Sequence, residues 1–207
     1  ALDGRLGLGD DGLVSGFYAK TETPGLNGDD TVFHLSAAAD TEEWSYSASV
    51  MQVGENFNPE VGFLRRTDFK RVGLFALKRW RDPAWENLLE LRPHISYRGW
   101  WGGADDLHET GFFHMDNHWE WKSGFEIHTG VNLLHEGVRE AFELAPGQVV
   151  EAGEYDDEEL QLVLMTAGPS NVYGQRGISA TTWVEKLYVS YVSVDLLNSK
   201  SSIWRDT

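Results

Sequence analysis

The chain has 207 residues and a formal net charge of −16, from 33 acidic and 17 basic side chains. Phosphate binding needs clustered Lys and Arg, so this charge balance excludes a nucleic-acid partner. The chain has no cysteine, which excludes a disulfide framework and a thiolate metal site. A transmembrane helix needs a run of roughly eighteen or more apolar residues. The sequence has no such run.

Alternation of polar and apolar side chains predicts roughly nine strands. Successive side chains of an extended strand point to opposite faces, so alternation marks one wet face and one apolar face. In chain order, the predicted strands are residues 13–21, 31–39, 44–50, 70–80, 88–98, 111–121, 125–134, 158–166 and 178–195.

The segment 111–121 has the clearest alternation. Its even positions from 114 onward carry one set of side chains and its odd positions the other: His114, Asp116, His118 and Glu120 against Phe113, Met115, Trp119 and Trp121. The second set is apolar and aromatic. This face is therefore predicted to meet either a core or a lipid.

Strand length distinguishes between those environments. Strands of ordinary globular sheets have about five to six residues, whereas a tilted membrane-spanning strand needs about nine to eleven. Several predicted strands are that long. Helical signals are poor, because even the best segment, 82–91, contains Pro83. The sequence predicts an all-β fold: an antiparallel up-and-down β-barrel of outer-membrane type, or a fragment of one, with long amphipathic strands joined by hairpins.

Turn residues separate the predicted strands. Residues 7–12 fit a GxGxxG pattern, but no βαβ context surrounds them, so they indicate a turn. Residues 23–30, 100–106 and 145–148 also read as turns. The acidic segment 153–159 is predicted as a solvated loop. Ca²⁺ is the one candidate cofactor there, through hard oxygen ligands, and no other cofactor is expected.

The region 52–69 interrupts the strand pattern. It combines Gly, Asn and Pro59 with Phe57, Phe63 and Phe69. Proline cannot donate a hydrogen bond to a strand ladder. The region is therefore predicted to be an ordered loop or an inward-folded segment, not a membrane-crossing strand.

Three motifs resemble a bacterial family of unknown function. They are GENFNPEVGF at 54–63 followed by Arg66-Thr-Asp68, DNHWEW at 116–121, and HTGVN at 128–132 followed by Glu136-Gly137. In that family the segment follows an amino-terminal carbohydrate-binding domain similar to family 9 modules. The resemblance implies the carboxy-terminal part of an outer-membrane β-barrel protein.

The resemblance runs from about residue 5 to about residue 171. It predicts a partial β-barrel domain at 1–171 and a divergent or truncated segment at 172–207. The chain starts at Ala1 without a signal-peptide pattern, so it is interpreted as a fragment. The resemblance implies a bacterial outer-membrane location. The expected partners are membrane lipid, the carbohydrate-binding domain that is missing from this chain, and, as a candidate, a polysaccharide.

Five residues are candidate metal ligands, because imidazole and carboxylate groups on one strand face suit zinc, copper or iron. His114 and His118 stand roughly 13 Å apart by strand rise, too far to share one ion. A polar barrel lumen with hydrogen-bonded side chains explains the same residues without a metal, and this interpretation is favoured. The five candidates are His94, His114, Asp116, His118 and His128.

Two carboxylates and several tryptophans are the other candidates. Glu120 and Glu126 flank the 122–124 turn, and a pair of carboxyls roughly 5–9 Å apart can hydrolyse a glycosidic bond. Tryptophans can stack on sugars, but Trp near strand ends is also expected at both bilayer interfaces, which is the favoured reading. The tryptophans considered for ligand binding are Trp100, Trp101, Trp119 and Trp121.

The sequence thus predicts a non-catalytic segment of an outer-membrane β-barrel, linked to carbohydrate or polymer binding or uptake at the cell surface. The alternatives are a soluble β-sandwich glycoside hydrolase and a non-catalytic carbohydrate-binding module. A barrel would place Trp119, Trp121, Ile127 and Val131 on an exterior surface, whereas a sandwich would bury them. If Val131 faces lipid, Val131→Arg should cost about 2–4 kcal/mol, and Asn132→Arg should be milder.

Overall fold

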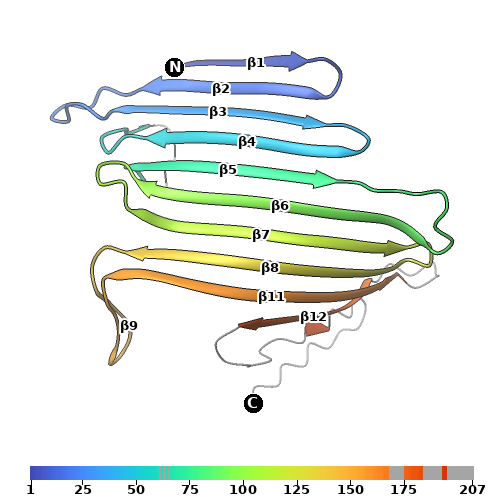
Figure 1. The fold of residues 1–207 in the computed structure, drawn as a ribbon. Coiled ribbons are helices and arrows are strands. Elements are labelled where there is room, and N and C mark those ends of the chain that lie inside the picture. Colours follow the sequence, from blue (N-terminus) through green and yellow to red (C-terminus); the bar gives the residue numbers. More distant parts are fainter. Residues whose placement is uncertain (61, 63, 65, 168–174, 184–192, 195–207) are drawn as a thin grey trace, which may run out of the picture.

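The computed structural model describes residues 1–60, 62, 64, 66–167, 175–183 and 193–194. These residues form one antiparallel sheet of eleven strands and a separate two-stranded hairpin (Figure 1). The first strands of the sheet are β1 (Leu2–Leu8), β2 (Gly12–Lys20), β3 (Thr31–Asp40), β4 (Trp44–Val53) and β5 (Phe69–Lys78). The remaining ones are β6 (Leu88–Gly102), β7 (His108–Trp121), β8 (Phe125–Val138), β11 (Gly153–Ala167), β12 (Gln175–Trp183) and β13 (Ser193–Val194).

Each strand pairs with its neighbour in sequence, with one exception. β8 pairs with β11 because β9 (Phe142–Ala145) and β10 (Gln148–Val150) form their own hairpin. The all-β, up-and-down prediction is confirmed. Within the described residues β1 pairs only with β2, so the sheet is open and corresponds to the fragment that the prediction allowed. The described part of the chain has no helix of the length and hydropathy that crossing a membrane requires.

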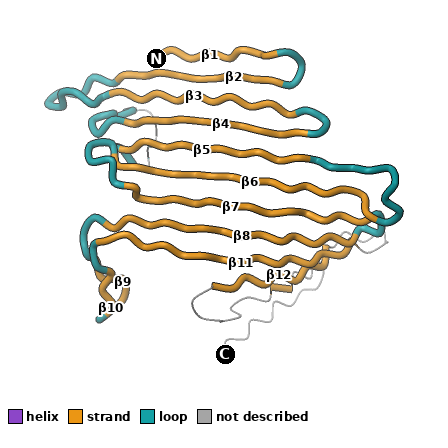
Figure 2. The backbone as a smooth tube through the Cα atoms, in the orientation of Figure 1, coloured by secondary structure: helices purple, strands orange, loops and turns teal. Residues whose placement is uncertain are grey.

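The segments that connect the strands lie along two opposite edges of the sheet, and they are mostly longer at one of these edges than at the other (Figure 2). At one edge, residues 9–11, 41–43 and 122–124 make tight turns, and residues 79–87 make a longer connection. Gly124 has φ 80°, a conformation that glycine adopts without strain. At the other edge, β2–β3, β4–β5 and β8–β11 are joined by longer segments.

The sheet has two faces of opposite character. Residues directly opposite each other in an antiparallel pair point to the same side. His94, Asp116 and His128 therefore share one side, here called the polar face, which also carries Ser47. Ile95, Met115 and Val131 are paired in one row on the other side, here called the apolar face. The predicted alternation at 111–121 is confirmed.

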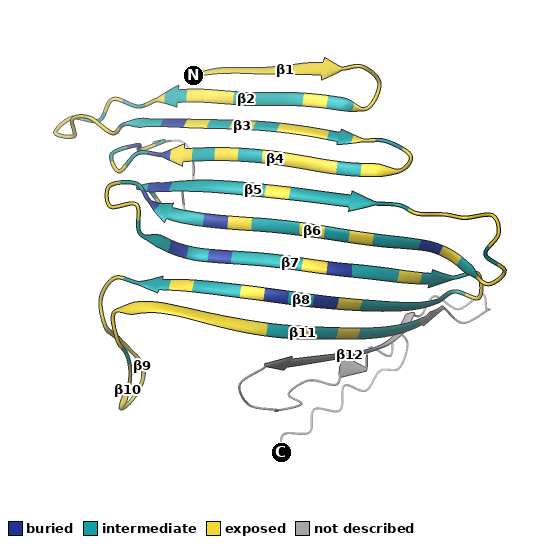
Figure 3. Cartoon of the chain, in the orientation of Figure 1, coloured by how far each residue is buried: buried dark blue, intermediate teal, exposed yellow. Residues whose placement is uncertain are grey.

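Few side chains are buried in this single layer (Figure 3). Among the described residues, the buried apolar cluster consists of Val32, Val53, Phe57 and Phe69. Phe57 belongs to the β4–β5 connection and packs against strand residues of the polar face. The Asn56 side chain donates a hydrogen bond to the backbone oxygen of Gly28 at 2.9 Å. The described residues between β4 and β5 thus form an ordered connection and not a strand, as the sequence predicts.

Four local predictions were wrong. Residues 178–195 do not form one strand, because β12 and β13 pair antiparallel there, with Ile178 opposite Val194. β1 was not predicted, although it pairs with β2 over its whole length. The acidic segment 153–159 is not a loop, because it forms the first half of β11 and pairs with residues 132–138 of β8. The turn predicted at 100–106 starts later, since β6 continues to Gly102. The sheet continues beyond residue 171 through β12, whereas residues 172–174, 184–192 and 195–207 of the predicted terminal segment lie outside the described part.

Candidate functional site

Strands β6, β7 and β8 bring all five predicted metal-ligand candidates together on the polar face. In the sheet register, His94 lies opposite Asp116, and His118 lies opposite His128. His114 precedes Asp116 by two positions on β7 and shares its face. Two trios of ligand atoms lie within 4.8 Å of one another: His94, His114 and Asp116, and Asp116, His118 and His128. The predicted strand faces thus produce two overlapping groups centred on Asp116.

Asp116 is the buried centre of this cluster, with 6% of its surface exposed. Its Oδ1 accepts a hydrogen bond from the backbone N–H of Thr129 at 3.1 Å. Its Oδ2 lies 3.9 Å from Nε2 of His114 and 3.5 Å from Nε2 of His118. One carboxylate oxygen is therefore held by the backbone of β8, and the other faces two imidazoles.

His94 and His114 face each other across β6 and β7, with their Nε2 atoms 3.1 Å apart. Nδ1 of His114 donates a hydrogen bond to Oδ1 of Asn132 at 2.6 Å. Asn132, which is 5% exposed, donates from Nδ2 to Oε2 of Glu159 at 2.5 Å. A hydrogen-bonded chain thus runs from β11 through β8 to the imidazole on β7.

His118 and His128 form a second pair, which has different partners. Their rings stack with centroids 3.5 Å apart and an interplanar angle of 8°. Nε2 of His128 donates to Oε1 of Glu126 at 2.8 Å, and Nδ1 of His118 lies 3.4 Å from the same oxygen. Both imidazoles therefore share one carboxylate on β8.

The predicted carboxylate pair is also brought together. Glu120 and Glu126 are opposite each other in the β7–β8 ladder. Nη2 of Arg92 lies 3.2 Å from Oε2 of Glu120 and 2.7 Å from Oε1 of Glu126. The guanidinium also lies 3.3 Å from the buried Glu90, which in addition pairs with Arg81. Arg92 thus occupies the space between the two candidate carboxylates.

The four candidate tryptophans do not form one platform. Trp119 and Trp121 lie on the apolar face near the end of β7, and none of Trp119, Trp121, Ile127 and Val131 is buried. Trp101 stacks on His108 with ring centroids 4.9 Å apart. Trp100 lies on the polar face, packs against the Phe57 cluster and carries Arg71 over its ring at 5.0 Å. The two adjacent tryptophans of β6 therefore have different surroundings.

The segment 153–159, which was the candidate for Ca²⁺ binding, forms part of a strand. Side chains of residues 153–159 alternate between the two faces because this segment belongs to β11. Asp156 accepts a hydrogen bond from Nδ1 of His135 at 2.7 Å, and Glu159 is bound by Asn132 on the other face. The acidic groups are thus divided between two networks.

Sequence reasoning did not include Arg92, Asn132 or Glu159 among the site residues. Alternation alone assigns Arg92 to the face of His94, and Asn132 to the face of His128. Glu159 falls within the predicted strand 158–166, but the sequence does not show which strand lies beside it. Its contact with Asn132 depends on β11 pairing with β8 past the β9–β10 hairpin.

A separate ion-pair cluster lies at the edge with the longer connections. The buried Glu109 pairs with Arg66 and Arg139, and Arg139 also donates to both oxygens of Asp105 at 2.8 and 2.9 Å. The hydrogen bond from Arg139, followed by that from the backbone N–H of Leu107, lowers the pKa of Asp105 to about 2. This cluster ties the β4–β5 and β8–β9 connections to the β6–β7 turn.

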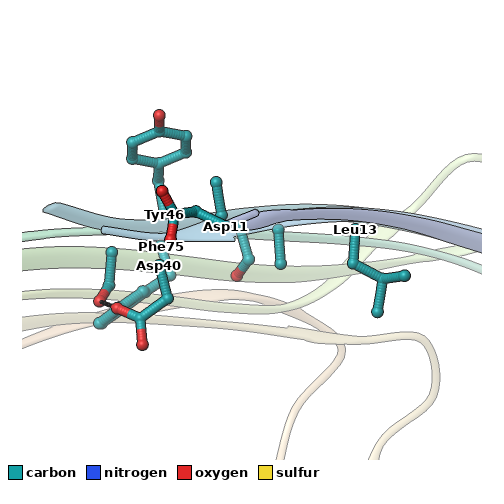
Figure 4. A pocket seen from close by; sticks show the side chains of 9 residues that line it. Asp11, Leu13, Asp40, Tyr46 and Phe75 are labelled. Atoms are coloured by element: carbon teal, nitrogen blue, oxygen red, sulfur yellow. Dashed lines mark hydrogen bonds between the residues drawn. The ribbon is translucent and has the colours of Figure 1, made fainter. Parts of the chain in front are cut away.

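A shallow hollow near the β1–β2 turn lies apart from all predicted candidates (Figure 4). Leu13, Asp40 and Phe75 point to one side of the sheet there, and Tyr46 points to the other. The short side chains of Ala38, Ser45 and Ser47 leave the space between the larger ones open. The hollow contains no group of convergent imidazoles.

No protein-family model matches the chain, and no curated protein or solved structure is significantly similar to it.

Proposed function

We propose that this chain is a segment of an outer-membrane β-barrel protein that provides anchoring or passage and cleaves no bond. Its parent protein would act in carbohydrate or polymer binding or uptake at the cell surface. The observation that carries the proposal is the contrast between the two faces of one long-stranded sheet. A transmembrane barrel needs apolar residues toward lipid and polar residues toward the lumen, alternating along each strand.

The apolar face exposes large hydrophobic side chains on successive strands. Leu6, Leu35, Val50, Leu74, Ile95, Met115, Leu133 and Leu160 are 39–62% exposed. Monomeric soluble proteins rarely expose contiguous apolar patches larger than a few hundred Å². Lipid is the partner that covers such a surface over many strands without a second protein layer.

Aromatic side chains gather on the apolar face where strands end. At the edge with the tight turns these are Trp44, Tyr46, Trp80, Trp119 and Trp121, and Lys78 lies over the rings of Trp44 and Trp80 at 5.2 and 5.7 Å. Interfacial tryptophan and tyrosine, with lysine near the headgroups, are typical of membrane-spanning strands. Trp100 does not belong to this group of aromatic residues, because it lies on the polar face.

The exposed apolar side chains of the apolar face form a band, and this band runs at an angle to the rows of residues that pair across neighbouring strands. The row through Leu35 and Val50 reaches His135 on β8 and Asp156 on β11. On β11 the apolar residues of this face instead start at Leu160. Strands of barrels are tilted by about 35–45° to the axis, so a band perpendicular to that axis shifts along successive strands. The observed shift supports a membrane-spanning arrangement.

Two observations support the non-catalytic, polymer-linked part of the proposal. The candidate carboxylates Glu120 and Glu126 are both bound by Arg92, so they do not flank an open space for a sugar. The motif resemblance connects this type of segment with a carbohydrate-binding domain.

Incubation of the full chain with polysaccharides should therefore release no reducing ends. Release that is abolished by Glu120→Gln would instead favour the glycosidase alternative.

Membrane exposure is tested with pairs of adjacent residues. The chain has no cysteine, so each variant carries one thiol for a nitroxide label. Val50→Cys and Ile95→Cys probe the apolar face, and their neighbours Ser49→Cys and Ser96→Cys are matched controls on the polar face. In lipid vesicles, labels at 50 and 95 should be accessible to O₂ and protected from a water-soluble nickel complex. The two serine positions should show the reverse preference.

Two outcomes contradict the proposal. One is protection of positions 50 and 95 from both reagents, which indicates a protein core as in a β-sandwich. The other is a monomeric chain that unfolds cooperatively in water without detergent, because the apolar face would then have no lipid to meet.

A further inference from the structure

We propose that His94, His114 and Asp116 bind one divalent first-row transition-metal ion, with Zn²⁺ as the reference ion, on the polar face of β6 and β7. The hydrogen-bond directions within this face would be the same whether or not the opposite face contacts lipid.

The tautomer of His114 is fixed by two partners. Nδ2 of Asn132 donates to the carboxylate of Glu159 at 2.5 Å, which turns Oδ1 of Asn132 toward His114. An amide oxygen only accepts, so Nδ1 of His114 carries the hydrogen in the 2.6 Å contact. A neutral imidazole has one N–H, and Nε2 of His114 therefore presents a lone pair.

The tautomer of His94 is fixed by the backbone. Its Nδ1 lies 3.3 Å from the carbonyl oxygen of Arg92, which also only accepts. Nε2 of neutral His94 therefore presents a second lone pair, 3.1 Å from that of His114. Two lone pairs at this distance repel each other unless a cation lies between them. The cation is either a proton or a metal ion.

The third donor favours a metal ion. Oδ2 of Asp116 lies 3.9 Å from Nε2 of His114, and the ligand atoms of all three residues lie within 4.8 Å of one another. Around tetrahedral zinc, with bonds of about 2.0–2.1 Å, neighbouring donors are about 3.3 Å apart. The two measured spacings lie on either side of that value. A shared proton requires only the two nitrogens, whereas a metal site uses the carboxylate as well.

The surroundings match those of metal-binding histidines. Such imidazoles donate their other N–H to a carbonyl or carboxylate, as His94 and His114 do to Arg92 and Asn132. Phe75 and Phe112 flank the pair with ring centroids 6.2 Å from His94 and 6.1 Å from His114, respectively. Two imidazoles and one carboxylate suit zinc or iron(II) better than Ca²⁺ or Mg²⁺, which prefer all-oxygen sites.

The second trio is less suitable. Nε2 of His128 donates to Glu126 at 2.8 Å, and Nδ1 of His118 lies 3.4 Å from the same carboxylate. The rings of these two histidines also stack face to face, with centroids 3.5 Å apart and an interplanar angle of 8°. The lone pair of an imidazole nitrogen lies in the plane of its ring, so two parallel stacked rings do not direct their lone pairs at one ion. His128 is therefore a matched control on the same face.

The experiment uses the full chain, prepared without a polyhistidine tag and treated with a chelator. Titration with Zn²⁺ by calorimetry, and with Co²⁺ by visible absorption, should give binding of one ion per chain. His94→Gln and His114→Gln should each abolish this binding, whereas His128→Gln should retain it. Far-UV circular dichroism checks that every variant keeps its β-structure.

Asn132→Leu gives a finer test, because it leaves the three ligands in place. Loss of an outer-shell partner should weaken metal affinity by about 10–100-fold. The proposal is overturned if the unmodified chain binds neither ion, which means that the imidazole pair holds only a proton. It is also overturned if His128→Gln abolishes binding while His94→Gln does not.

Discussion

Arg92 on β6 reaches across β7 to Glu126 on β8, with 2.7 Å between Nη2 and Oε1. The same guanidinium lies within 3.3 Å of Glu90 and Glu120. Three carboxylates from three strands thus share one cation. This contact spans two ladders, so it reinforces the backbone pairing of three of the longest strands.

Replacing Arg92 with alanine should lower the free energy of unfolding by about 2–3 kcal/mol, because hydrogen bonds to charged groups contribute about 1.5–3 kcal/mol. Glu90, whose side chain is only 6% exposed, would retain Arg81 as a partner, but Glu120 and Glu126 would repel each other. Urea unfolding in lipid vesicles measures the change. The control is Arg98→Ala, an exposed residue over the ring of Phe112, which should cost less than about 1 kcal/mol. Equal losses would contradict the bridging role.

Substitution of Val131 by arginine should cost about 2–4 kcal/mol in a bilayer, since the side chain lies on the apolar face. Asn132→Arg, the milder control expected from sequence, is unsuitable, because Asn132 is 5% exposed and binds both His114 and Glu159. Gln161, half-buried on the polar face of β11, is the better control. Unfolding in vesicles should show a small effect for Gln161→Arg. A similar cost at both positions would contradict the assignment of the faces.

Phe57→Ala should destabilise the folded β4–β5 connection. Phe57 is 8% exposed, and removing a buried phenylalanine side chain costs about 3–5 kcal/mol when the site cannot collapse. Limited proteolysis should then cut within residues 54–68, while the sheet remains intact by circular dichroism. Phe142→Ala, at a position 48% exposed on β9, is the control and should leave this region resistant. Unchanged resistance in Phe57→Ala would mean that the connection is held by its hydrogen bonds alone.

Stability should fall at acid pH through Asp105. Its pKa in the folded chain is lowered to about 2 by Arg139, below the value of about 3.9 for an unfolded aspartate. The stabilisation is therefore complete above about pH 4 and is lost as the pH falls toward 2. Asp105→Asn should unfold at lower urea concentration than the unmodified chain at pH 6. The two midpoints should converge near pH 2, and a constant difference down to that pH would contradict the assignment.

The sequence predicts the strands of this fold best where alternation is strong, as in β7 with His114 and Asp116. It fails in the first half of β11, where residues 153–159 are almost uniformly polar and carry no alternation, whereas the second half agrees with the predicted strand 158–166. Pairing with β8 decides the structure there, which is a tertiary effect that local pattern does not contain. β1 did carry a signal, with Leu2, Leu6 and Leu8 on one face, but two glycines weaken it.

The candidate site is partly readable from sequence for the same reason. Consecutive hairpins place β6, β7 and β8 side by side, so His94, Asp116 and His128 could be expected on neighbouring strands. The direction of each hydrogen bond could not be predicted. It depends on Asn132 meeting Glu159, and therefore on β11 following β8 in the sheet after the intervening hairpin.

The β9–β10 hairpin projects from the sheet and pairs only with itself, and every residue of β9 is exposed. The backbone between Pro146 and Gly147 can therefore accept added sequence without disturbing any ladder of the sheet. An epitope inserted at that point would be a topological marker. Antibody binding to intact cells would reveal whether the edge with the longer connections faces the outside, as the long loops of outer-membrane barrels do.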